Sequence, residues 1–139
     1  MSNLSKQTVI TLIKVNCAVN DVLSQALKPH EVSIQQFNVL RILRGQKGVA
    51  ANLSTVQERM VNRMSNTTRI IDKLIDKGFV ERTICKKNRR KIELFITDKG
   101  LKMLDQIDQV VEQAEIQMTQ NLSPEQQQKL VSLLKQINV

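Results

Sequence analysis

A change of hydrophobic period at Gly78 limits the folds open to this chain more than any other feature of its sequence. Before Gly78, from about residue 64, apolar side chains recur every three or four residues, which predicts a helix with one buried face. After it, residues 79–85 and 91–97 alternate in polarity, which predicts two strands. Gly78 itself is expected to end the helix in the left-handed conformation. The pattern therefore predicts a helix followed directly by a β-hairpin.

The loop between the two predicted strands reads K-K-N-R-R, residues 86–90. A loop of four cations and an asparagine has no evident packing role. Upstream, the motif Ser54-x-x-Gln57 matches a capping box and predicts a short helix, with residues 61–63 as the turn to the next one. Two helices followed by a hairpin with a basic loop predict a winged helix-turn-helix, in which the loop is the wing.

Positive charge is concentrated in the same part of the chain. Residues 59–91 hold eleven basic and three acidic side chains, an excess equal to the formal net charge of the whole chain, +8. Charge segregated in this way indicates a surface for a polyanion, although a basic run can also serve solubility alone. The chain has three phenylalanines and no tryptophan or tyrosine, whereas single-stranded nucleic acid is usually stacked on aromatic side chains. The basic surface therefore suits a duplex.

One outward row of the predicted helix contains Ser65, Arg69, Lys73 and Lys77, each four residues from the next, and the last three of these are cations. Neighbouring like charges cost an isolated helix roughly a few tenths of a kcal/mol per pair, but they become favourable when phosphates lie opposite them. Ser65, Asn66, Thr68 and Arg69 are also of the types that reach base edges in a major groove. For Ser65 and Asn66, helix capping or contact with water remains an equal alternative.

Helical patterns precede this middle part. A strongly apolar pattern predicts a helix over residues 4–27, which Pro29 ends. The motif Ser33-x-x-Gln36 is a capping box that opens a second helix, and Gly45 closes it. The connection that follows leaves room for a short strand at residues 49–51.

Two more helices are expected after the hairpin. Thr97 is the expected N-cap of a long helix that ends near Gln120, and Ser123-Pro124 begins the last helix. Outside residues 59–91 the chain is apolar in its helices and carries no net charge. The economical explanation is that the terminal helices pair two copies of the chain. A two-fold dimer would hold two recognition helices about 34 Å apart, which matches a pseudo-palindromic DNA site.

The expected fold class is mainly α with a small β wing, in a single domain over residues 1–139. Residues 33–97 form the winged helix-turn-helix DNA-binding part. Residues 4–28 and 98–138 form the helical dimerisation part that flanks it.

The order and length of these elements resemble those of the MarR family of bacterial transcription regulators over essentially the whole chain. Ser65 to Arg82, S-N-T-T-R-I-I-D-K-L-I-D-K-G-F-V-E-R, is similar to that family's recognition helix and the strand after it. Asn88 to Gly100, N-R-R-K-I-E-L-F-I-T-D-K-G, is similar to its wing signature, D-x-R followed by L-T-x-x-G. Asn88 replaces the aspartate that steadies the wing arginine in the family, and the replacement leaves this wing more positive.

The resemblance implies a role for each site residue. Ser65, Asn66, Thr68 and Arg69 would enter the major groove, and Arg90 would reach a narrow minor groove beside it. The residues expected to hold phosphates are Lys73, Lys86, Lys87 and Arg89. The resemblance also implies a homodimer, usually a repressor, which in some members is released by small aromatic or phenolic ligands bound between the dimer helices and the winged part.

The two cysteines raise redox sensing as a minor alternative. Some members of the family sense peroxides through a cysteine in the first helix, with the help of tyrosine hydroxyls that this chain lacks. Cys17 lies on an apolar helical face and is therefore expected to be a buried structural thiol. Cys85 precedes two lysines, which would favour its thiolate, and is expected to be exposed and oxidisable.

Other classes of function find little support in the sequence. One histidine, His30, expected in a loop, and two distant cysteines make no metal site, and no nucleophile and base are paired, so neither an enzyme nor a cofactor is expected. There is no signal peptide or membrane-spanning run, so a cytoplasmic protein is expected. The rival interpretation is a winged-helix adaptor or a non-specific DNA-coating protein.

Overall fold

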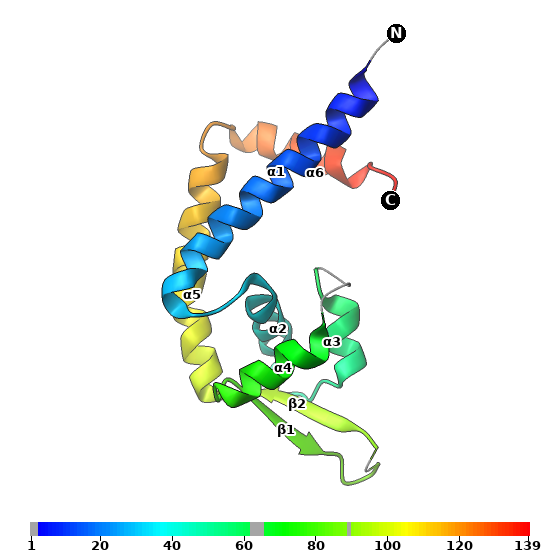
Figure 1. The fold of residues 1–139 in the computed structure, drawn as a ribbon, viewed down its shortest axis with the longest axis vertical. Helices are drawn as coiled ribbons and strands as arrows, with labels where there is room; N and C mark the ends of the chain where they lie inside the picture. The colour runs from blue at the N-terminus through cyan, green and yellow to red at the C-terminus, as the bar shows by residue number, and fades with distance from the viewer. Residues whose placement is uncertain (1–2, 62–65, 89) are drawn as a thin grey trace.

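The computed structural model describes residues 3–61, 66–88 and 90–139 (Figure 1). Its elements, in chain order, are α1 (Leu4–Leu27), the 3₁₀ helix η1 (Lys28–His30), α2 (Ile34–Gly45), α3 (Leu53–Arg59), α4 (Thr67–Asp76), β1 (Val80–Ile84), β2 (Ile92–Ile96), α5 (Asp98–Thr119) and α6 (Pro124–Lys135). The terminal helices occupy one end of the molecule, and the hairpin of β1 and β2 lies at the other end. The predicted class, mainly helical with a small β wing, is confirmed.

The two strands that the alternating pattern predicts form an antiparallel hairpin. Val80 lies opposite Ile96 and Ile84 lies opposite Ile92 in an antiparallel pair. Gly78, with φ of +80°, takes the left-handed conformation expected between helix and strand. The short strand expected at residues 49–51 is present as a single bridge, in which Ala51 exchanges backbone hydrogen bonds of 3.1 and 2.7 Å with Leu94.

The core lies in the winged part and at the base of α5. Its fully buried side chains include Leu40, Leu43, Val56, Leu74, Leu94, Leu104 and Ile107. Arg44 of α2 adds a two-pronged ion pair to Asp108 of α5, with N–O distances of 2.5 and 3.4 Å. The hairpin and α2 to α4 are therefore fixed as a unit on the lower half of α5.

Three local expectations are wrong. The short helix α3 begins two residues earlier than the Ser54 motif predicts, because Asn52 is its N-cap and accepts from the backbone N–H of Thr55 at 2.8 Å. Ser54 instead donates its hydroxyl to the same Asn52 oxygen. Helix α4 begins at Thr67, not near residue 64, and His30 lies in η1 and not in a loop.

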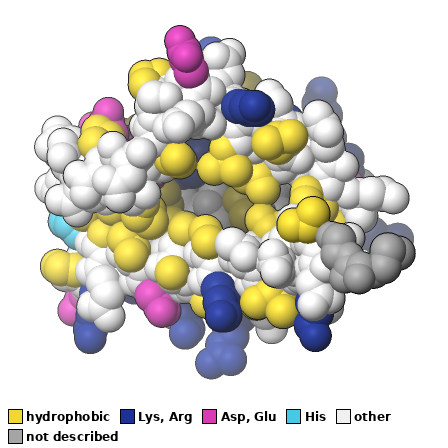
Figure 2. Space-filling model, turned by 90° about the horizontal axis from the view of Figure 1, so that it is seen from above, with side chains coloured by type: hydrophobic (Ala, Val, Ile, Leu, Met, Phe, Trp, Pro, Cys, Tyr) yellow, Lys and Arg dark blue, Asp and Glu magenta, His cyan; other side chains and the backbone are white. Residues whose placement is uncertain are grey.

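The helices at the two ends bury few of their apolar side chains. In α1 only Leu27 is buried, and in α6 no residue is buried. A groove of about 690 Å³ runs between them, with Leu12, Val15, Leu133, Leu134 and Ile137 among its lining residues. Figure 2 shows many hydrophobic side chains exposed at this end, around a hollow. Among the residues that the structure describes, these apolar faces are left largely uncovered.

Cys17 is exposed, so the expectation of a buried thiol is wrong for the single chain. Helix α1 packs against α5, and Val19 and Leu23 are among its half-buried residues. Cys17 lies on another face of α1 with Ile13, which is also exposed. An apolar pattern on a helix therefore does not tell which chain covers it.

Candidate nucleic-acid interface

Helix α4 exposes its cations because its apolar side is anchored in the core. Thr67, Ile71 and Leu74 are buried. The same 3.6-residue period that buries them places Thr68, Arg69 and Lys73 in solvent. These three predicted site residues thus share one exposed surface, while Ser65 lies outside the described residues.

Asn66 caps this helix. Its side-chain oxygen accepts a hydrogen bond of 3.2 Å from the backbone N–H of Arg69. The capping alternative considered for Asn66 is therefore confirmed. The side chain remains exposed, and its amide N–H₂ is still free to face a base or a phosphate, because the cap uses only the oxygen.

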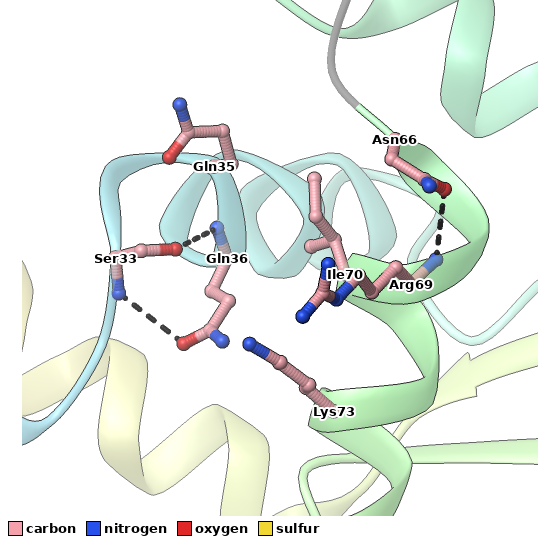
Figure 3. Close-up of a pocket in the computed structure, with 7 residues that line it drawn as sticks. All are labelled: Ser33, Gln35, Gln36, Asn66, Arg69, Ile70 and Lys73. Carbon is pink, nitrogen blue, oxygen red and sulfur yellow. Dashed lines mark hydrogen bonds between the residues drawn. The ribbon is translucent and has the colours of Figure 1, made fainter.

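A cleft of about 260 Å³ separates α4 from the start of α2 (Figure 3). Arg69 and Lys73 point from α4 toward the first turn of α2. There Ser33 and Gln36 form a reciprocal capping box, with hydrogen bonds of 3.0 and 3.2 Å. A helix N-terminus beside two cations favours a negatively charged group. The sequence shows the capping box, but nothing in it shows that this box lies beside the recognition helix.

In the wing, Asn88 accepts two hydrogen bonds from backbone N–H groups. Its side-chain oxygen accepts from the backbone N–H of Arg90 at 3.1 Å, and its carbonyl accepts from the N–H of Lys91 at 2.9 Å. Asparagine is favoured at such a position because its side chain can close the turn by bonding to the backbone two residues on. Lys86, Lys87, Asn88 and Arg90 are all exposed, and Arg89 lies outside the described residues. The amide thus forms the turn without bringing a negative charge.

An ion pair joins α4 to the hairpin. Arg82 of β1 lies 3.8 Å from the Asp72 carboxylate, and both side chains are about half exposed, at 53% and 54%. Such an exposed pair contributes little to stability. It does, however, use one of the three acids in the basic stretch to orient the base of the wing beside α4.

Lys77 does not continue the outward row of α4, contrary to its sequence spacing. Its ammonium group donates to the carbonyl oxygen of Glu31 and, at 3.2 Å, to the side-chain oxygen of Gln36. Lys77 is the C-cap of the helix, so its side chain leaves the helix where the α-helical row ends. Within α4, the predicted row therefore keeps two exposed cations, Arg69 and Lys73.

The parts of the chain that the structure describes hold no candidate metal site. There, no three histidine, cysteine or acidic side chains come together as a metal site would require. Cys85 is half-buried, so the expectation that it is exposed is wrong, and it is not paired with Cys17. Within the same residues, every helix is too short or too polar to traverse a bilayer.

Comparison with known proteins shows which proteins this chain is similar to. The MarR family model matches residues 32–92. The chain is 32% identical over 114 residues to the uncharacterized HTH-type transcriptional regulator YkoM of Bacillus subtilis, an alignment covering 81% of this chain and 71% of that protein. The fold matches a MarR-like regulator from Bacillus cereus, with a TM-score of 0.87, 21% identity and coverage of 99% and 100%.

A mutant MarR of Escherichia coli, solved in complex with operator DNA, also matches the fold. Its TM-score is 0.83 at 25% identity, and the match covers 96% of this chain and 94% of that one. This chain and the Escherichia coli MarR therefore share the whole arrangement of elements, including the terminal helices. The chain belongs to the MarR family of transcriptional regulators.

Proposed function

We propose that this regulator binds double-stranded DNA sequence-specifically as a homodimer and represses transcription from a pseudo-palindromic operator. The observation that carries the proposal is the surface on which Thr68, Arg69 and Lys73 stand exposed on an anchored helix. A basic wing extends from the hairpin behind that helix. The operator DNA bound by the Escherichia coli relative agrees with this use of the surface.

Within this surface we assign the recognition of base edges and the contacts to phosphates to different residues. Thr68 and Arg69, with Asn66 and Ser65 at the start of the helix, would read base edges in the major groove. Arg90 at the wing would enter the minor groove. The phosphate contacts would come from Lys73, Lys86, Lys87 and Arg89. The N-terminal end of α2 would add a further phosphate contact through the cleft beside Arg69.

The proposed dimer uses the apolar faces of α1 and α6. Leu130, Leu133 and Leu134 of α6, and Ile137 just after it, all face water or the groove, with exposures of 38–51%. An amphipathic helix exposed in this way is unfavourable in a monomer and typical of an interface. A second copy is the occupant that fits best, because a two-fold axis can pair these helices with their own copies. We therefore assign dimerisation to residues 4–28 and 98–138, and DNA binding to residues 33–97.

We also propose that a small aromatic or phenolic effector releases the DNA. A cleft of about 620 Å³ lies between α1 and α2, with Asn16, Asn20, Gln35 and Asn38 among its lining residues. A cleft of this size suits a small molecule. Because one wall belongs to the dimerisation part and the other to the winged part, a bound molecule there would alter their relative position.

Selection of bound sequences from a random duplex pool tests the proposal. We expect one palindromic sequence with half-sites about one DNA turn apart, bound with a steep salt dependence and a large preference over random DNA. A non-specific coat would show the salt dependence without the preference, and a protein-binding adaptor would show neither. Either of these results would contradict the proposed function.

A further inference from the structure

The C-terminal end of the recognition helix α4 is tied to the segment that leads from α1. Lys77 donates from its ammonium group to the carbonyl oxygen of Glu31, which lies between η1 and α2 in the left-handed conformation, with φ of 57°. The same group bonds to Gln36, whose side chain is buried and whose oxygen also closes the capping box of α2. One cation therefore connects α4 to the junction between α1 and α2.

The same end of α4 is tied to the start of α5. Lys99 donates to the carbonyl oxygen of Lys77 at 3.0 Å, and Thr97 donates its hydroxyl to the carbonyl oxygen of Gly78 at 2.7 Å. Gly100 is buried against this corner, where a Cβ atom would clash with the carbonyl of Phe79. The Lys99 ammonium also lies 5.4 Å from the centre of the Phe79 ring. Helix α5 therefore begins in close contact with the point where α4 ends.

These contacts meet at one place because the segment that follows α1 and the start of α5 both lie at the C-terminal end of α4. All three bonds from Lys77 and Lys99 run from an ammonium group to a neutral oxygen. Hydrogen bonds from a charged donor are stronger than those between neutral groups and fix direction as well as distance. Lys77 thus links α4 to a neighbouring segment of the protein, although its spacing in the sequence is that of the DNA-facing cations.

We infer that Lys77 and Lys99 are positioning residues, which fix α4 relative to α1 and α5 and so set the separation of half-sites that the dimer accepts. The inference rests on the proposed function, because α1 and α5 belong there to the dimerisation part. One added base pair moves a half-site by about 3.4 Å and turns it by about 34°. If α4 is held rigidly, it cannot follow that change. The spacing between the half-sites therefore becomes part of the specificity.

The test compares three variants that each remove one positive charge: Lys77→Met, Lys99→Met and Lys73→Met. Each is measured against a set of duplexes that carry the selected half-sites, with the spacer lengthened or shortened by one and two base pairs. Thermal unfolding of each variant checks that it is folded. Lys99 is exposed, so Lys99→Met provides a second variant that relaxes the joint from the α5 side without disturbing the buried Gln36.

The parent protein should prefer its best spacing by about tenfold or more over a change of two base pairs. Lys77→Met and Lys99→Met should bind the best spacing within about twofold of the parent, while the preference falls about fivefold. Lys73→Met should lose affinity by the same factor at every spacing, with the preference intact, because a phosphate contact carries no spacing information.

Two results would overturn the inference. One is a parent-like spacing preference in Lys99→Met and in folded Lys77→Met. The other is a uniform loss of affinity in those variants, as in Lys73→Met. Failure of the parent protein to bind any duplex with two half-sites would instead overturn the proposed function, so the two failures are distinguishable.

Discussion

Helices α4 and α6 are both amphipathic and similar in length, at 10 and 12 residues, but only α4 buries its apolar side within its own chain. Ile71 and Leu74 of α4 lie in the core, whereas Leu133 of α6 is 51% exposed. The part that carries the basic surface is therefore complete in one copy. The terminal helices are complete only when something covers them, which in our proposal is a second copy.

The largest expected effect comes from charging the proposed interface. Leu133→Asp would bring a carboxylate into an apolar contact in each copy, at a cost of about 2–4 kcal/mol per copy. We expect the dimer dissociation constant to rise more than about a hundredfold, and tight operator binding to be lost with it. Sedimentation velocity and a duplex-binding titration measure the two effects.

Gln128→Asp is the matched control, since it adds the same charge to α6 on the side away from the groove. It should leave the dimer intact. If both variants dimerise like the parent protein, the groove between α1 and α6 is not the interface.

Next in size is the division of labour within the basic surface. Arg69→Ala should cost about 1–3 kcal/mol on the selected operator and relax base preference. Lys87→Ala should weaken all duplexes about equally and reduce the salt slope by about 1. Binding isotherms on specific and random duplexes at several salt concentrations separate the two effects. Identical behaviour of the two variants would show that base recognition and phosphate contact are not divided between Arg69 and Lys87.

The independence of the winged part can be tested at Asn52. Asn52→Ala removes the cap of α3, whose oxygen accepts hydrogen bonds from Ser54 and Thr55, and should lower the free energy of unfolding by about 1 kcal/mol. Chemical denaturation measures this loss. The dimer dissociation constant should not change, because Asn52 is remote from α1 and α6 in the fold. A large change in dimerisation would mean that the two parts are not separate in the way we describe.

The smallest expected effect concerns the turn in the wing. Asn88→Ala loses the side-chain bond to the Arg90 N–H and should weaken operator binding by less than about 1 kcal/mol. Asn88→Asp keeps an acceptor for that N–H but adds a negative charge, so its loss of affinity should be larger at low salt than at high salt. Titrations at two salt concentrations measure both variants. Equal, salt-independent losses would contradict a role of the neutral amide in keeping the wing positive.

Local signals in the sequence predict most of the fold. The two strands of the hairpin follow from alternation, and the N-caps Ser33, Thr97 and Ser123 each accept the expected backbone N–H. At α3 two good capping residues, Asn52 and Ser54, compete within three positions. Asn52 caps the helix next to Ala51, which is paired with β2, and that pairing joins residues far apart in the sequence.

The parts that sequence could not predict depend on distant neighbours. Lys77 has the spacing of a DNA-facing cation, but its acceptors come from a segment 41 and 46 residues away. Cys17 has the pattern of a buried residue, yet it is exposed in the single chain. Periodicity identifies a face of a helix. Only the tertiary arrangement tells what that face meets.

The number of chains on a duplex tests the central claim most directly. Native mass spectrometry of the protein with duplexes of increasing length, each carrying one selected site of about 20 base pairs, gives this number. We expect two chains per duplex at every length, and a dimer without DNA. A single chain per site, or a count that grows with the length of the duplex, would contradict the account.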